Sequence, residues 1–281
     1  PHKVGMRYHN KKRQMRIDGE NISHQAALAD LGAVLWLTPE MDRLFAGSPA
    51  ARRRFFDRLV FSLTPDHAHN LSQYTRHLQH RSKLLKTPNP DPHWLDIEEQ
   101  YAAHYGVKVV QARHAYLAKL APYMPEVTLT LKGGADTQTK EIKNQETKDL
   151  EQIYAQKLRD SRLQDARFGG NSFGPHRSDI SGTLVNTTPL ARASMGQHKR
   201  ALLLILLAAA QLQKTQSGQA PCLLLDEVAT HLDSTARAIL YQKLPPLGGQ
   251  IWLTGTEKHY FTDLTTAKFI YMANGIPTPE F

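Results

Sequence analysis

The sequence is poor in cysteine and has no long apolar run. Its single cysteine, Cys222, excludes an internal disulfide and a metal site built from cysteines. The longest apolar stretch, residues 201–210, is about half of what a membrane-spanning helix needs. The N-terminus has no signal-peptide pattern, and no pair of the 14 histidines has His-x-x-x-His spacing. We therefore expect a cytosolic protein without a membrane span and without a zinc site.

Acidic residues are in the minority. The chain has 35 Lys and Arg against 26 Asp and Glu, a formal net charge of +9 and a pI near 9.6. This surplus favours polyanionic partners, with nucleic acid first and an anionic membrane surface second. A basic surface without such a partner is the plain alternative. A length of 281 residues suits one large domain or two moderate ones.

Two adjacent carboxylates, Asp226 and Glu227, end the apolar run at residues 222–225. Such a run predicts a strand of a parallel sheet that is buried on both faces. Open α/β sheets bind ligands at the carboxyl ends of their strands. Two acids there suit a Mg²⁺-nucleotide, with Asp226 orienting the metal's water shell and Glu227 polarising an attacking water. A strand that ends in a helix-capping acid is the alternative.

A phosphate-binding loop is missing. No Gly-x-x-x-x-Gly-Lys-Ser/Thr occurs in the sequence, although that loop normally supplies the N–H groups and the lysine that hold a nucleotide's phosphates. The chain opens with Pro1 and not with Met. We therefore expect a fragment that has lost its front end, and a degraded ATPase is the alternative.

A serine turn opens the long apolar helix that precedes the Asp-Glu strand. Ser194, Gly196 and Gln197 lie at the start of a helix predicted over residues 194–214. A serine hydroxyl beside bare N–H groups at a helix N-terminus can hold an anion, and glycine lets a phosphate approach the backbone. Ordinary N-capping by Ser194 is the commoner explanation. The pairing with the Asp-Glu strand favours a ligand site.

Other polar clusters stand outside these two motifs. In the cluster at 174–179, Arg177 could reach a phosphate, although a structural hydrogen-bond knot is the commoner explanation. Two basic triplets are predicted to contact a DNA backbone, and a solvated surface is about equally plausible for both. These triplets are Arg52, Arg53 and Arg54, and Lys11, Lys12 and Arg13.

Apolar spacing and turn residues divide the chain into three parts. Residues 1–47 resemble the remainder of an α/β lobe, 48–166 an inserted helical arm, and 167–281 a second α/β lobe. The predicted helices are a short one capped by Ser23 and ending at 31, one running on from Ser48 through Leu85, and others at 93–120, 148–165, 194–214 and 234–243. The predicted strands are 14–18, 33–37, 127–131, 179–185 with a break at Gly182, 222–225 and 250–254.

Taken together, the chain resembles the RecF family of bacterial DNA-repair ATPases, which are relatives of the SMC heads. The resemblance runs nearly from end to end, and Gly-Pro-His-Arg-Ser-Asp at 174–179 is its most specific piece. Where many relatives place a switch histidine, this chain has Thr254-Gly255-Thr256, and Thr254 or Thr256 is a candidate hydrogen-bonding residue. The other matching stretches are 16–19, 38–40, 47–57, 194–197, 223–227 and 232–233.

The resemblance implies an α/β ABC-type ATPase head, P-loop NTPase-like and incomplete at the N-terminus, with an inserted helical subdomain. Two subunits would pair head to tail around two ATP molecules. Each ATP site would combine one subunit's phosphate loop and Asp-Glu strand with the signature serine of the other. Mg²⁺ would sit at Asp226, and Glu227 would be catalytic. The nucleotide-binding residues would be Ser194, Gly196, Gln197, Asp233 and Thr254.

The resemblance also implies partners. These are double-stranded DNA at single-strand/double-strand junctions, RecR- and RecO-like proteins, and a second copy of the chain in an ATP-dependent homodimer, in a bacterial, nucleoid-associated cytoplasmic setting. We predict that this chain alone binds ATP poorly and does not hydrolyse it. A non-enzymatic DNA-binding scaffold with a decayed ATP site, and another SMC-like ABC ATPase, remain as alternatives.

Overall fold

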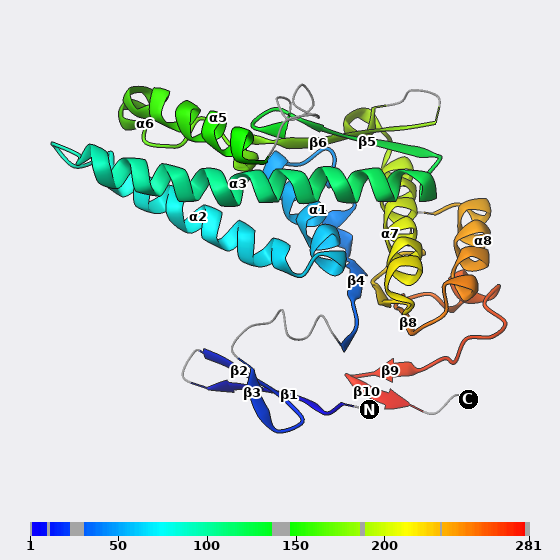
Figure 1. Cartoon of the computed structure of the whole chain (residues 1–281). Coiled ribbons are helices and arrows are strands. Elements are labelled where there is room, and N and C mark those ends of the chain that lie inside the picture. Colours follow the sequence, from blue (N-terminus) through cyan, green and yellow to red (C-terminus); the bar gives the residue numbers. More distant parts are fainter. Residues whose placement is uncertain are drawn as a thin grey trace.

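A three-stranded parallel sheet lies at the centre of the body (Figure 1). Its strands β4 (Val34–Leu37), β7 (Cys222–Leu225) and β8 (Ile251–Leu253) stand in the order β4-β7-β8. The computed structural model describes residues 2–9, 12–22, 31–136, 147–185, 189–230 and 232–278. Within them, the parallel pairing of three strands predicted from apolar runs confirms the α/β class.

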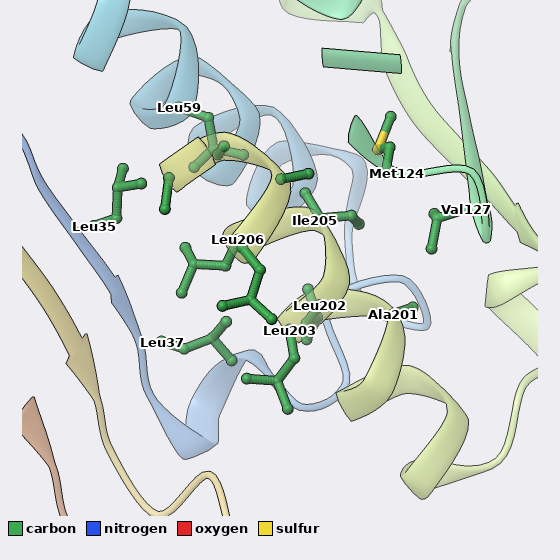
Figure 2. Packing of buried hydrophobic residues seen from close by; sticks show 14 of the residues in the cluster. Leu35, Leu37, Leu59, Met124, Val127, Ala201, Leu202, Leu203, Ile205 and Leu206 are labelled. Atoms are coloured by element: carbon green, nitrogen blue, oxygen red, sulfur yellow. The ribbon is translucent and has the colours of Figure 1, made fainter. Parts of the chain in front are cut away.

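Helix α7 (Met195–Ser217) covers one face of this sheet (Figure 2). A helix that is apolar all round is expected to be buried, and residues 201–210 of α7 are buried except for a half-buried Leu204. Leu202 and Leu206 belong to one apolar cluster with Leu35 and Leu37 of β4. Each such leucine stabilises the fold by roughly 1.5–3 kcal/mol, so the packing of α7 helps to hold the sheet in place.

The opposite face of the sheet is uncovered in the described part of the chain. Val34, Leu224 and Trp252 are 46%, 41% and 48% exposed. Successive side chains of a strand point to opposite faces, so Leu223 and Leu225 are buried while Leu224 between them is not. The prediction that this strand is buried on both faces was therefore wrong.

A second apolar cluster forms inside the helical arm. Helices α2 (Asp66–Leu84) and α3 (Pro92–Leu120) pack along their length, and α5 (Thr147–Asp160) lies against α3. Figure 1 shows α2 and α3 side by side, joined at the far tip of the arm. Tyr74, Val107 and Tyr154 belong to this cluster. The sequence-derived division at residues 48 and 166 stays a prediction, and α1 (Pro49–Leu63) shares the apolar cluster of the sheet.

Several predicted elements differ in detail. Ser48 caps α1 as expected, its hydroxyl accepting from Ala51 N at 3.2 Å, but the helix does not run on to Leu85. It ends at Leu63 because Pro65 cannot continue the backbone hydrogen bonds, and α2 begins at Asp66. The helix expected over 148–165 is likewise two, with α6 (Arg162–Phe168) starting after Ser161.

Two further corrections concern a strand and two aromatic side chains. The strand β6 (Asp179–Leu184) is continuous through Gly182, which pairs with a residue of β5 (Val127–Lys132). The apolar spacing of the helix predicted at 93–120 includes Trp94 and Tyr101 on its apolar face, yet these two side chains of α3 are 55% and 51% exposed. The residues that follow them, Leu95 and Ala102, are buried instead. At both places the buried face of α3 is therefore shifted by one residue from the expected position.

The remaining elements are small. Strands β1 (Val4–His9), β2 (Lys12–Ile17) and β3 (Glu20–Ile22) form an antiparallel sheet, with a turn at Asp18–Gly19 between β2 and β3. Helix α8 (Ser234–Lys243) is as predicted, and β9 (Tyr271–Ala273) pairs with β10 (Ile276–Thr278). None of the described helices is both long and apolar enough to cross a bilayer. The helix expected from Ser23 falls almost wholly on residues outside the described ranges.

Candidate nucleotide site

Asp226 and Glu227 lie at the carboxyl end of β7, between the ends of β4 and β8. Asp226 N donates to Leu37 O at 2.9 Å, so the chain is still held to β4 at the first acid. Glu227 has a φ of 52°, in the left-handed region that non-glycine residues rarely adopt. Such strain is found preferentially at functional sites. Asp226 is exposed and Glu227 half-buried, so both acids are oriented by the turn and not used for packing.

Thr254, at the end of the neighbouring strand, ties the two acids together. Its hydroxyl donates to Asp226 Oδ1 at 2.5 Å and accepts from Glu227 N at 3.1 Å. The Glu227 carboxylate accepts from the Thr230 hydroxyl at 2.9 Å. The structure thus brings Thr254, which the sequence proposed separately, to the Asp-Glu pair, and it adds Thr230.

A buried lysine supports this turn from behind. Lys199 of α7 is 2% exposed, and its ammonium donates to Glu227 O at 2.7 Å and Thr230 O at 2.8 Å. It also forms an ion pair with Asp42 at 3.4 Å. The sequence showed Lys199 only as a basic residue in the first turns of a helix. In the sequence it stands next to Arg200 at the start of a long apolar run, and its partners could not be found without the fold.

The serine turn before α7 is a complete capping box. Gln197 N donates to Ser194 Oγ at 3.3 Å, and Ser194 N donates to Gln197 Oε1 at 2.9 Å. The ordinary N-cap is therefore present. Ser194 and Gln197 are nevertheless exposed and Gly196 is half-buried. The turn thus presents a hydroxyl and a helix N-terminus to solvent, and α7 links it to the Asp-Glu turn through Lys199.

Asp233 caps the following helix. Its carboxylate accepts from Ala236 N at 2.7 Å and is exposed, at the start of α8. It does not contact Asp226 or Glu227 through any hydrogen bond of the described residues. The candidate residues therefore form three separate groups within one chain. These groups are Ser194 with Gln197, Asp226 with Glu227 and Thr254, and Asp233 by itself.

The cluster at 174–179 is a structural knot. His176 is hydrogen-bonded to the Tyr74 hydroxyl at 2.6 Å and to Asn171 O at 2.9 Å, and Arg177 Nε donates to the same carbonyl at 2.8 Å. Burial lowers the pKa of His176, so its neutral form is favoured. The hydrogen-bond explanation of this cluster is thus the one its geometry favours.

The three arginines of the triplet at 52–54 differ in their hydrogen-bond partners. Arg52 forms a bidentate pair with Asp179, at 2.7 and 2.9 Å, and Arg53 donates to Ser178 O at 2.6 Å. Arg54 alone of the three is exposed. Two of the three guanidinium groups therefore join α1 to the start of β6, and Arg54 is the one oriented towards solvent. Lys11 lies outside the described residues, as do the side chains of Lys12 and Arg13.

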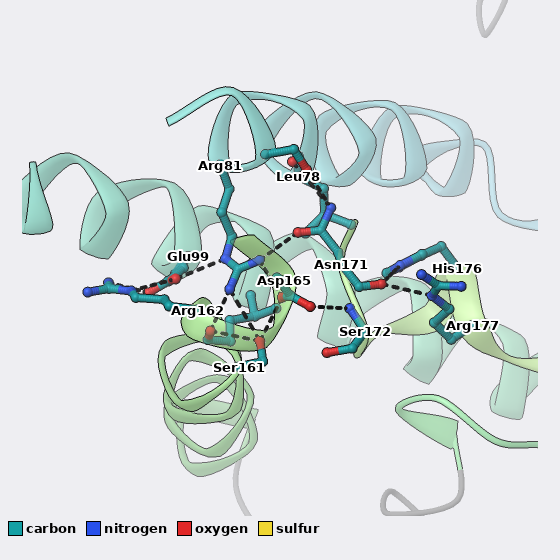
Figure 3. A network of polar contacts seen from close by, with 12 residues as sticks. Leu78, Arg81, Glu99, Ser161, Arg162, Asp165, Asn171, Ser172, His176 and Arg177 are labelled. Carbon is teal, nitrogen blue, oxygen red and sulfur yellow. Dashed lines mark hydrogen bonds and ion pairs between the residues drawn. The ribbon is translucent and has the colours of Figure 1, made fainter. Parts of the chain in front are cut away.

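Arg81 connects the arm to the loop after α6 (Figure 3). Its guanidinium donates to Glu99 at 2.9 Å, to Asp165 at 2.7 Å and to Asn171 Oδ1 at 2.7 Å. Asn171 O in turn accepts from Arg177. The side chain of Arg81 is 0% exposed, so this is a buried polar network. No sequence pattern marked Arg81, because its partners come from four different segments.

Solved structures and curated proteins were compared with the chain. Two solved structures, described as the recombination mediator protein RecF with ATPrS and with ATP in the RecFOR pathway, superpose with TM-scores of 0.82 and 0.78. They are 21% and 22% identical, and the match covers 98% and 96% of this chain and 76% and 73% of theirs. No protein-family model matches the chain.

The chain has the α/β fold of these solved RecF structures. Among curated proteins, the DNA replication and repair protein RecF of Agrobacterium fabrum is 39% identical over 274 residues, covering 94% of this chain and 72% of its own length. RecF of Rhizobium meliloti is 37% identical over 279 residues, covering 94% of this chain and 73% of its own length. The chain belongs to the RecF family of DNA replication and repair proteins.

Proposed function

We propose that this protein acts as a RecF-type recombination mediator whose nucleotide-bound dimer clamps DNA. One observation carries the proposal: Asp226 and Glu227 are held at the end of β7 by the Thr254 hydroxyl, and the buried Lys199 ammonium holds the Glu227 carbonyl from behind. A core does not need two oriented acids at a sheet edge, whereas a magnesium nucleotide does.

The donors at this edge fit Mg²⁺. Asp226 offers an exposed carboxylate and Thr254 a hydroxyl, and Mg²⁺ takes oxygen ligands and keeps several waters. When bound, Mg²⁺ would neutralise charge on the phosphate oxygens. Glu227 would orient the attacking water and accept its proton, with its carboxylate positioned by Thr230 at 2.9 Å.

The exposed serine turn fits a role in a second subunit's site. Ser194 lies with Gln197 on a helix N-terminus that has no acid in its first turn, which suits a phosphate. Because this turn is separate from Asp226 within the chain, it would complete the site of the partner, with Asp233 beside it. The uncovered face of the sheet, with Leu224 and Trp252, would receive a phosphate-loop segment, which the printed sequence lacks.

A DNA duplex next to a single-stranded gap would bind through backbone contacts, and RecO- and RecR-like proteins would join it. The net charge of +9 and the exposed Arg54 support this assignment. The triplet Lys11, Lys12 and Arg13 is assigned to DNA on its sequence alone. Arg52 and Arg53 would act indirectly, by holding α1 to β6.

The test uses a chimera in which the phosphate-loop segment of a RecF relative precedes Pro1. The chain by itself should bind a fluorescent ATP analogue poorly and show no turnover. The chimera should bind ATP and form dimers only with ATP, as measured by light scattering. Glu227→Gln should prolong the ATP-bound dimer because it keeps the side chain's size and removes the base.

Ser194→Arg separates the roles of the two subunits. It should abolish ATP-dependent dimers of the chimera while leaving ATP binding unchanged. Ser217→Arg, at the exposed far end of the same helix, is the matched control and should change neither. Dimers that form without ATP, or that survive Ser194→Arg, would count against the proposed arrangement.

A further inference from the structure

Three metal-ligating side chains meet on the outer part of the arm, away from the nucleotide site. His77 and His80 of α2 and Glu98 of α3 have ligand atoms that all lie within 4.8 Å of one another. His77 Nδ1 is 2.7 Å from Glu98 Oε2, and His80 Nδ1 is 3.2 Å from Glu98 Oε1. Each imidazole therefore points a ring nitrogen at the same carboxylate.

The spacing of this group differs from the His-x-x-x-His pattern of a helical metal site. His77 and His80 are three residues apart, a spacing that also places two side chains on one face of a helix. The third ligand lies on another helix, and only the antiparallel packing of α2 against α3 brings it near. Two imidazoles and one carboxylate form the ligand set of open zinc sites that keep a water at the fourth position.

The surroundings suit a cation and fix the ligands in place. The side chains of His77 and Glu98 are 15% and 14% exposed, and that of His80 is 39% exposed. The site is thus shielded on the helix side and open to water on the other. The His77 ring stacks on Tyr101, with centroids 4.9 Å apart and planes 16° from parallel. This stacking restricts the ring and accounts for Tyr101 lying outside the core.

The choice of cation follows from the donors. Imidazole nitrogen suits Zn²⁺, Cu²⁺ and Ni²⁺, whereas Mg²⁺ and Ca²⁺ prefer all-oxygen sites. Both imidazole rings are hydrogen-bonded to the carboxylate, and a metal ion would take the place of these contacts. We propose that His77, His80 and Glu98 form a Zn²⁺ site that clamps α2 to α3 and stiffens the arm.

The experiment uses the whole chain without an affinity tag, titrated with Zn²⁺ in a calorimeter and with Co²⁺ in a spectrophotometer. We expect one strong site per chain, visible Co²⁺ absorption bands of a four-coordinate ion, and a rise in the melting temperature with Zn²⁺ that EDTA reverses. His80→Ala and Glu98→Gln should each weaken binding by at least about 10- to 100-fold, the range that the loss of even an outer-shell partner costs. Both variants should still fold, because His80 is partly exposed and the amide that replaces the Glu98 carboxylate would keep a hydrogen-bond acceptor.

His104→Ala is the matched control. His104 is paired with Glu151 at 2.9 Å on the same arm, and it lies outside the three-ligand group. This substitution should leave Zn²⁺ affinity unchanged. The proposal is overturned if no strong site is found, which would make the trio a hydrogen-bond cluster only. It is equally overturned if His80→Ala and Glu98→Gln bind Zn²⁺ as tightly as His104→Ala does.

Discussion

Replacing Arg81 with methionine should destabilise the helical arm, because it removes a buried charge that pairs with two acids. The methionine keeps much of the length of the side chain but removes every donor. Arg81 is fully buried, and its guanidinium binds Glu99 and Asp165, whose side chains are both 2% exposed. It also donates to Leu158 O at 2.6 Å. The variant would leave a buried carbonyl without this donor and two buried acids with fewer partners.

The size of the stability loss depends on the partners that Glu99 and Asp165 keep in the variant. Removing one partner of a buried ion pair costs about 3–5 kcal/mol. Glu99 keeps Arg162, at 2.5 and 2.9 Å, and Asp165 keeps the Ser161 hydroxyl at 2.8 Å. The loss should therefore lie near the lower end, about 3 kcal/mol. At about 2 °C per kcal/mol for a chain of this size, the melting temperature should fall by roughly 6 °C.

The measurement is urea unfolding followed by far-UV circular dichroism, with melting as a second readout. Arg162→Met is the matched control, because it removes an arginine from the same Glu99 but from a side chain that is 20% exposed. It should cost less, since water can replace part of the lost contacts. The reasoning fails if Arg81→Met costs no more than Arg162→Met, because burial would then not decide the outcome.

Three further predictions concern single residues. Lys199→Met should cost about 2–3 kcal/mol of unfolding free energy, measured with urea, because it removes the donor behind the Asp-Glu turn. It should also speed amide hydrogen exchange around Glu227, and unchanged exchange would contradict a supporting role for Lys199. Burial of Asp57 works against its charged form, but hydrogen bonds from His67 and Arg113 hold the pKa of Asp57 below its ordinary value. Its stabilising effect is therefore full above about pH 4 and lost as the pH falls through the folded-state pKa, so an acid titration should find Asp57→Asn least costly in acid. Gly182→Ala should cost about 1–3 kcal/mol, because a Cβ there would lie 2.7 Å from a methyl of Leu190. An unchanged melting temperature would rule this clash out.

The parts of the fold that sequence analysis predicted well are those with strong local signals. Helix α7 follows from the Ser194 cap and an apolar run, and β7 follows from an apolar run that ends in Asp226. The errors have local causes as well. Pro65 should have ended the first arm helix, and the alternation along β7 left Leu224 exposed, because no described element covers that face.

The strand-end residues of the candidate site could be expected from the sequence, but the residues that support them could not. Asp226, Glu227 and Thr254 stand at strand ends, and strand ends of a parallel sheet meet at one edge, so their proximity could be expected. Lys199 and Thr230 were missed, because a lysine near the start of a helix carries no signal of which carbonyls it will reach.

By itself, the sequence determined the main helices and the strands of the parallel sheet, where the two acids stand and which family the chain resembles. These depend on periodicity, capping and short motifs, which are local properties of the chain. Only the tertiary structure decided that Arg81 joins four segments, that Lys199 supports the acidic turn, and that Glu98 meets two histidines. Such contacts join residues far apart in the sequence, and they depend on how whole helices pack against one another.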